Sequence, residues 1–248
     1  MDITAVFPAY NEEQSIRSTM DLAVAALRRL CDRFEILIIN DASHDETGRI
    51  ADELAQQYPE IRVLHNQRNL GQGGSIVRGF AEARYEWVIH NAMDYPFDLR
   101  DLALLLPYTE KADIVSAARD RYAGYTLSRK AMSWANRMLL GLLFGLKLRD
   151  YNFVQLYRKR IWERVRVESK STAFLTPEAM IRAHDMGFRI VEVVTRYRAR
   201  EEGVATSGSL RVISHSLRDM FRFWWHRSVV NRRAYFKEAR EQRAEARN

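Results

Sequence analysis

The chain has 248 residues, 47% of them hydrophobic, and a formal net charge of +7. This length suffices for one sizeable domain with a full core. The single cysteine, Cys31, excludes a disulfide framework and indicates a reducing compartment. The most apolar stretch, residues 138–148, is too short to cross a bilayer. Because Met1 and Asp2 lead directly into a core-type run, we expect no signal peptide.

Apolar runs that end at polar or glycine-rich loops predict an α/β fold with a mainly parallel sheet. The first run ends at Pro8, and a helical stripe follows over 13–30; the second precedes a turn at 40–45 and a helix over 46–58. Such alternation of strand and helix is typical of a parallel sheet covered on both faces. We expect strands near 3–7, 34–40, 61–65, 86–91 and 112–118.

Asp41 lies just past the end of the second predicted strand. Ligands of open α/β sheets bind outside the carboxyl ends of strands, so Asp41 can accept hydrogen bonds from a base or ribose there, with Tyr10 beside it. The alternative is that Asp41 and Ser43 only cap the next helix.

Several motifs, taken in order, resemble those of the family 2 glycosyltransferases of GT-A fold, and among them the dolichyl- or polyprenyl-phosphate mannose and glucose synthases. They are FPAYNEE at 7–13, INDASHDET at 39–47, RNLGQGGSIVRGF at 68–80, DYNFVQLYR at 150–158 and GFRIVEVVTRYRAREEG at 187–203. Arg129, Ser133 and Asn136 match a further helix of that family. The resemblance covers about residues 2–206, and the order and spacing of the motifs carry it.

The resemblance implies a site for a nucleotide diphosphate linked to a sugar, with either uridine or guanosine as the base. The nucleotide-binding residues that it implies are Pro8, Tyr10, Glu12, Asp41, Gly71, Gly73 and Asn91; the catalytic residues are Asp94, Arg129, Asp150 and Arg200; and Ser133 and Glu178 lie on the acceptor side. Arg200 and Gly203 resemble a loop that closes over the diphosphate, although Val204 to Thr206 replace a lysine that often follows.

The fourth strand departs from the family pattern at the metal site. The family ends this strand in Asp-x-Asp, which holds Mg²⁺ or Mn²⁺ against the diphosphate, whereas Asn91 and Met93 occupy the two positions here. Hard cations prefer charged oxygen ligands, which neither residue supplies. Three alternatives stay open: a reshaped site with Asp94 as metal ligand, or Asp98; metal-independent donor binding helped by arginines; and nucleotide-sugar binding without turnover.

Two further helices are predicted in the second half of the domain. Ser128 can cap a helix that runs to about Leu146 and carries Arg129, whose planar fork of donors suits a phosphate. The alternative is that Arg129 lies on a solvent-exposed face of the helix and binds no ligand. Thr176, Pro177 and Glu178 read as the start of a second helix that Gly187 ends, so an acid there can also be purely structural. A last strand is expected over 189–197.

Residues 207–248 form a basic tail after the glycosyltransferase domain at 1–206. The tail has ten arginines and lysines against four acids, and its apolar residues recur at helical intervals (Leu210, Ile213, Leu217, Met220 and Trp224). A basic amphipathic helix with clustered aromatics is typical of attachment to an anionic membrane surface. The alternative is a stripe that packs on its own domain or on a second subunit, as a homo-oligomer. Nucleic acid is a weaker partner, because no reader motif is present.

These features favour transfer of a sugar, with inversion, to a lipid phosphate. We expect a cytoplasmic enzyme that is peripherally attached to the inner face of the cell membrane. Displacement at an anomeric carbon requires a nucleophile, a stabilised leaving group and exclusion of water. A phosphate arrives as an anion, whereas a hydroxyl acceptor needs a carboxylate base. The runner-up is therefore a soluble hydroxyl acceptor, with Asp150, Asp94 or Glu178 as base. A nucleotide-sugar-binding pseudoenzyme is the third reading.

Overall fold

The computed structural model describes residues 1–120, 126–169, 171–195 and 210–245. Within these ranges seven strands form one sheet, in the order β3-β2-β1-β4-β6-β5-β7. The strands are β1 Asp2–Ala9, β2 Arg33–Asn40, β3 Ile61–His65, β4 Trp87–His90, β5 Ile114–Arg119, β6 Val154–Arg158 and β7 Ile190–Thr195. The helices are α1 Ile16–Leu30, α2 Thr47–Gln57, α3 Gly71–Ala81, α4 Leu102–Leu105, α5 Leu127–Phe144, α6 Lys159–Arg164, α7 Thr172–Asp185, α8 Leu210–Trp225 and α9 Arg232–Glu245; short turns of 3-10 helix flank α4 (Leu99–Asp101 and Leu106–Tyr108), and a π-helical turn, His226–Val230, follows α8.

The sheet is mainly parallel, as the sequence predicts. β1 pairs in parallel with β2 and with β4, and β2 pairs in parallel with β3. The exception is β6, which lies between β4 and β5 and runs antiparallel to both. Consequently the start of β6 lies at the same edge of the sheet as the carboxyl ends of β1, β2, β4 and β5.

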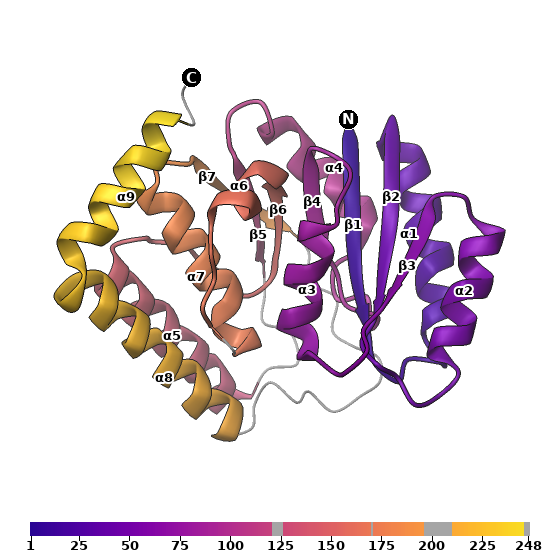
Figure 1. The fold of residues 1–248 in the computed structure, drawn as a ribbon, viewed down its shortest axis with the longest axis horizontal. Coiled ribbons are helices and arrows are strands. Elements are labelled where there is room, and N and C mark those ends of the chain that lie inside the picture. Colours follow the sequence, from indigo (N-terminus) through magenta and orange to yellow (C-terminus); the bar gives the residue numbers. More distant parts are fainter. Residues whose placement is uncertain (121–125, 170, 196–209, 246–248) are drawn as a thin grey trace.

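Alternate residues of the central strands point to two separate cores, one on each face of the sheet. Ile36 and Ile38 pack with α1, α2 and α4, whereas Leu37 and Ile39 pack with α3 and α7 (Figure 1). On the second face α3 lies very close to β1: a Cβ added at Gly79 would stand 2.3 Å from Cγ1 of Val6. The near-continuous apolar runs thus follow from burial on both faces.

The C-terminal helices pack on the second face rather than standing apart from it (Figure 1). Met220 and Phe223 of α8 are buried, and the ring of Phe223 stacks on Phe144 of α5 at 5.5 Å between centroids. Met220 and Trp224, which the sequence analysis assigned to a membrane-facing stripe, therefore face the domain. The domain boundary at 206 stays a prediction, since it lies outside the described residues.

One predicted helix start is wrong. α7 begins at Thr172, so Pro177 lies inside the helix rather than at its first position. The N–H groups of Phe174 and Leu175 both bond the carbonyl of Ser171, which starts the helix one turn earlier. Gly187, with φ +84°, ends this helix as predicted.

Candidate functional site

Most of the predicted site residues in the described part of the chain lie at one edge of the sheet. The loops after β1, β2 and β4 leave from carboxyl strand ends, and the loop before β6 reaches the same edge because β6 is antiparallel. This edge contains the point where the chain order reverses, on the two sides of β1. Open α/β sheets bind their ligands at such a point.

Asp41 anchors the glycine-rich loop rather than capping α2. Its side chain is only 2% exposed, and its Oδ1 accepts hydrogen bonds from Nδ2 of Asn66 (2.6 Å) and from the backbone N–H of Leu70 (2.8 Å). Within the described residues no hydrogen bond ends on Oδ2 of Asp41. The side chain that bonds the first residue of α2 is Asp45, one position before the N-cap residue Glu46: its Oδ1 accepts from the N–H of Thr47 at 3.0 Å.

The glycine-rich loop enters α3 directly after this anchor. Gly71 has φ +72°, a conformation that favours glycine, and its N–H donates to Oδ1 of Asn69 at 2.9 Å. Gly73 is buried in the first turn of α3. A helix N-terminus offers backbone donors to anions, so this loop is suited to phosphate.

The loop after β1 lies beside the loop after β2. The N–H of Asn11, which has φ +56°, donates to Oγ of Ser43, and the N–H of Glu12 donates to Oγ1 of Thr47 at 2.7 Å. Oε2 of Glu12 accepts from Oγ of Ser15 at 2.6 Å. Pro8 is half-buried, whereas the ring of Tyr10 is exposed and meets His44 edge-on. Tyr10 is thus available to a ligand at this edge.

Asn91 and Met93 do not present metal ligands. Met93 is 2% exposed and packs in the core, while its backbone carbonyl accepts from Oγ1 of Thr19 at 2.7 Å. The amide group of Asn91 is used internally: its Nδ2 donates to the carbonyl of Phe97, and its Oδ1 accepts from the N–H of Ala92. Both positions of the expected Asp-x-Asp motif are therefore engaged in holding their own loop.

The neighbouring carboxylates do not rebuild the site among themselves. Asp98 is buried and holds Arg100, whose Nη2 lies 2.6 Å from its Oδ2. Asp94 is exposed. In the described ranges no three His, Cys, Asp or Glu side chains are grouped so that they can hold a metal ion. The residues at the expected position thus do not fit a divalent cation, and Asp94 as metal ligand stays a prediction.

A small pocket of about 40 Å³ lies where β5 ends and β6 begins. Arg119, Ser133, Asn136, Arg137, Asp150, Tyr151 and Asn152 line it. Arg119 holds Asp150 through two hydrogen bonds, from Nε to Oδ2 (2.6 Å) and from Nη2 to Oδ1 (2.9 Å). Asp150 is 4% exposed. The predicted residues Ser133 and Asp150, 17 positions apart in the sequence, are thereby brought together.

Arg119 is a pocket residue that the sequence analysis missed. It is the last residue of β5, so the rule that ligands bind at carboxyl strand ends is the signal that points to it. Its guanidinium also lies over the ring of Phe153, at 5.3 Å from the centroid. Glu192 of β7 holds the adjacent loop by accepting from the N–H groups of Arg149 and Asp150, and burial raises the pKa of this carboxyl group.

Glu178 is not joined to this pocket by the described contacts. The oxygens of Glu178 are occupied by the N–H groups of Glu168 and Ser169, the hydroxyl of Ser169, and Arg182, which favours a structural role. Its acceptor role stays a prediction. The side chain of Arg129 and all of Arg200 lie outside the described residues.

A buried histidine lies directly below this edge of the sheet. His90 ends β4, next to Asn91, and its ring meets Phe80 edge-on. Burial lowers the pKa of His90 to about 4, so the imidazole is neutral at pH 7. His90 therefore contributes no positive charge to a ligand bound at this edge.

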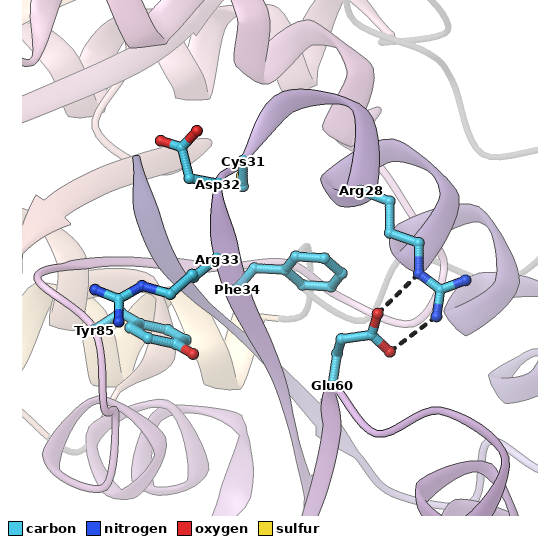
Figure 2. Close-up of a pocket in the computed structure, with 7 residues that line it drawn as sticks. All are labelled: Arg28, Cys31, Asp32, Arg33, Phe34, Glu60 and Tyr85. Carbon is cyan, nitrogen blue, oxygen red and sulfur yellow. Dashed lines mark hydrogen bonds and ion pairs between the residues drawn. The ribbon is translucent and has the colours of Figure 1, made fainter.

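A larger hollow, of about 320 Å³, lies at the opposite edge of the sheet (Figure 2). Figure 2 shows Arg28 and Glu60 joined by two hydrogen bonds, of 2.8 and 3.0 Å, with Arg33 beside Tyr85. Burial raises the pKa of the Cys31 thiol to about 11, so this cysteine is unreactive at neutral pH. The hollow lies at the amino ends of the strands, away from the predicted site.

Comparisons with known proteins agree with this architecture. A structure of glucosyl-3-phosphoglycerate synthase from Mycobacterium tuberculosis, in complex with Mn²⁺, UDP and glucosyl-3-phosphoglycerate, superposes with a TM-score of 0.67 at 18% identity, over 89% of this chain and 79% of that one. It shows the fold alone. Undecaprenyl-phosphate mannosyltransferase of Micrococcus luteus is 30% identical over 82% of this chain and 86% of its own length.

Glycosyltransferase AglD of Haloferax volcanii is 29% identical over 92% of this chain, which spans only 38% of that relative. The family model described as glycosyl transferase family 2 matches residues 4–175. That match covers more than half of the chain and contains the loops that build the carboxyl edge. The chain therefore has the GT-A fold and belongs to glycosyl transferase family 2.

Proposed function

We propose that the protein transfers a sugar, with inversion, from a nucleotide diphosphate sugar to a polyprenyl phosphate at the inner face of the cell membrane. The observation that carries this proposal is the pocket between α5 and β6. It combines Arg119 and Arg137 with Ser133 and Asn136, and its carboxylate, Asp150, is held by Arg119. Arginines suit a phosphate, whereas both oxygens of Asp150 already accept hydrogen bonds from Arg119 and are therefore poorly placed to take a proton from a hydroxyl acceptor.

The reaction requires no proton to be removed from the acceptor. An oxygen of the lipid phosphate attacks the anomeric carbon, a C–O bond forms there, and the bond from that carbon to the donor diphosphate breaks. The nucleoside diphosphate leaves with the bonding electron pair. The protein's contribution is to orient the two anions, to balance their charge and to exclude water.

For the donor we propose the edge of the sheet that carries Tyr10, Asp41 and the loop at Gly71. Asp41 accepts from the base or ribose, and the first turn of α3 faces the phosphates. Because Asn91 and Met93 do not fit a cation, we assign no step to a metal at their position, and cationic side chains balance the diphosphate. GDP and UDP are both compatible with this site.

The relatives support the choice of a lipid phosphate. The Micrococcus protein is named as an undecaprenyl-phosphate mannosyltransferase, and a relative from Rhizobium johnstonii, 28% identical, as a dodecaprenyl-phosphate galacturonate synthase. A polyprenol monophosphomannose synthase from Mycolicibacterium smegmatis is 29% identical. Their sugars differ, so the sugar that this chain transfers is left open.

The test is turnover of radiolabelled UDP- and GDP-sugars with undecaprenyl phosphate in detergent, with and without EDTA, followed by extraction of the lipid product. We expect label in the organic phase, and Arg119→Gln should remove it. Arg33→Gln, at the opposite edge of the sheet, is the matched control and should leave transfer unchanged. Label on a sugar hydroxyl but not on the lipid would favour the soluble-acceptor reading.

One observation favours a second candidate, a protein that binds nucleotide sugar without transferring it. Met93 is buried in the core, so the loop after β4 cannot present a carboxylate there without losing that packing. Nucleotide-sugar binding in calorimetry, together with no transfer to any acceptor and no hydrolysis, would establish that the protein is such a binding protein.

A further inference from the structure

Exposed apolar side chains are gathered on two helices. Of the seventeen large hydrophobic side chains that are exposed in the described part of the chain, ten lie on α5, on α8 and on the π-helical turn after α8. Isolated exposed hydrophobics are normal on a soluble protein, but a concentration of them marks an interaction surface. No described helix meets the length and apolarity that a bilayer span requires.

The stripe on α5 runs along its solvent side for the full helix. Leu127, Ala131, Trp134, Met138 and Leu142 recur at intervals of three and four and are all exposed, with Trp134 at 59% and Leu142 at 83%. Two other sets of α5 side chains are already occupied. Leu140 and Phe144 are buried in the core, and Ser133, Asn136 and Arg137 line the pocket with Asp150.

A second apolar ridge lies on α8. Leu217, Phe221, Trp225 and Val229 follow one another at intervals of four and are exposed, with Trp225 at 52%, while Met220 and Phe223 point into the domain. Phe223 of α8 stacks on Phe144 of α5. The ribbons of the two helices lie next to each other in Figure 1. Apart from Leu217, the exposed ridge thus consists of other side chains than the stripe that the sequence predicts on this helix.

The same two helices are strongly cationic. Residues 127–144 and 210–225 contain six arginines and lysines and a single acid, Asp219. Oδ2 of Asp219 accepts from the N–H of Ser171, so this carboxylate is turned toward the domain. Lys130, Arg218 and Arg222 are exposed on these helices. Like charges of this kind on two copies of the chain would repel each other, whereas an anionic surface attracts them.

We propose that the exposed stripe of α5, together with the ridge of α8, lies on an anionic lipid bilayer. The inference rests on the proposed function in one respect: α5 bears the docking stripe on one side and the acceptor pocket on another. A prenyl chain in the bilayer can then place its phosphate in the pocket without leaving the lipid. The aromatic rings and flanking cations have the chemistry of the headgroup boundary.

The experiment is co-sedimentation of the full chain with vesicles of phosphatidylcholine alone and of phosphatidylcholine with phosphatidylglycerol, at low and high salt. We expect binding to the anionic vesicles that weakens with salt. The variant Trp134→Ser with Leu142→Ser should reduce it about tenfold or more, since both side chains are exposed apolar contacts. The matched control is Leu22→Ser with Leu104→Ser, which changes exposed leucines on α1 and α4. Thermal unfolding confirms that both variants fold.

The outcomes separate this proposal from the proposed function. Equal vesicle binding by both variants and the parent chain overturns the docking face, whatever the activity. The docking face is also refuted if the parent chain does not bind vesicles but forms a stable dimer in sedimentation velocity, and the α5 variant is a monomer. If the α5 variant loses vesicle binding but still glycosylates a short, water-soluble prenyl phosphate at the parent rate, both proposals stand. Vesicle binding without transfer to any lipid phosphate retains the docking face and refutes the proposed function.

Discussion

Replacement of Asp41 separates its two roles, as anchor of the glycine-rich loop and as acceptor for the nucleotide. In the structure both of its hydrogen bonds end on Oδ1, at 2.6 and 2.8 Å, and the side chain is buried. Hydrogen bonds to a charged group contribute about 1.5–3 kcal/mol each, so Asp41→Ala should lower the free energy of unfolding by about 3–6 kcal/mol. That is a large part of the stability of an ordinary domain.

Asp41→Asn tests the nucleotide contact more directly than Asp41→Ala does. Its amide oxygen can still accept the hydrogen bonds from Asn66 and Leu70, although without the negative charge. Neutral hydrogen bonds contribute about 0.5–1.5 kcal/mol each, so we expect unfolding to cost about 2–3 kcal/mol less than in the parent. The substitution also replaces Oδ2 by an NH₂ group, which cannot accept from a base or ribose. Nucleotide affinity should therefore fall by about 1–3 kcal/mol, equal to about 5- to 150-fold in Kd.

The assays are urea unfolding and calorimetric titration with UDP and GDP. The matched control is Ser75→Ala, since Oγ of Ser75 accepts from the same Nδ2 of Asn66 at 3.0 Å but lies inside α3. This control should be less stable and should bind nucleotide normally. If Ser75→Ala weakens nucleotide binding as much as Asp41→Asn does, Asp41 acts only through the loop. Unchanged affinity in Asp41→Asn would refute the contact altogether.

Four other predictions follow from single contacts. Asp150→Asn should lower the unfolding free energy by about 3–5 kcal/mol by removing the buried negative charge that Arg119 contacts, while the pH–rate profile keeps its shape; loss of the acidic limb of that profile would identify Asp150 as a base. Burial lowers the pKa of His90 to about 4 in the folded chain, whereas an unfolded histidine takes up a proton below about pH 6.5. The free energy of unfolding should therefore fall by about 1.4 kcal/mol per unit as the pH is lowered from about 6.5 to about 4. His90→Leu should flatten this slope in urea unfolding. Donor binding should survive EDTA; if Mn²⁺ instead tightens it and Asp94→Asn abolishes that gain, Asp94 is the metal ligand. Gly79→Ala should cost about 1–3 kcal/mol in urea unfolding, because its Cβ meets Val6, and an unchanged midpoint would show that α3 can shift.

The sequence by itself determined the parallel half of the sheet and the edge at which the site lies. Continuous apolar runs such as 34–40 report burial on both faces, and burial of this kind belongs to the parallel strand pairs found here. The position of Asp41 follows from the same pattern, because a residue just past a parallel strand lies at the carboxyl edge whatever the tertiary details. These properties depend on residues close together in the chain.

Only the tertiary structure decided how distant segments meet. The antiparallel insertion of β6 between β4 and β5 brings Arg119 to Asp150 across 31 positions, and no local pattern encodes that pairing. The same holds for surfaces: periodicity shows that one side of α8 is apolar, but not what covers it. Met220 and Phe223 are covered by α5 and α7, while Phe221 and Trp225 stay exposed, because burial is set by the neighbours that the fold supplies rather than by the side chain itself.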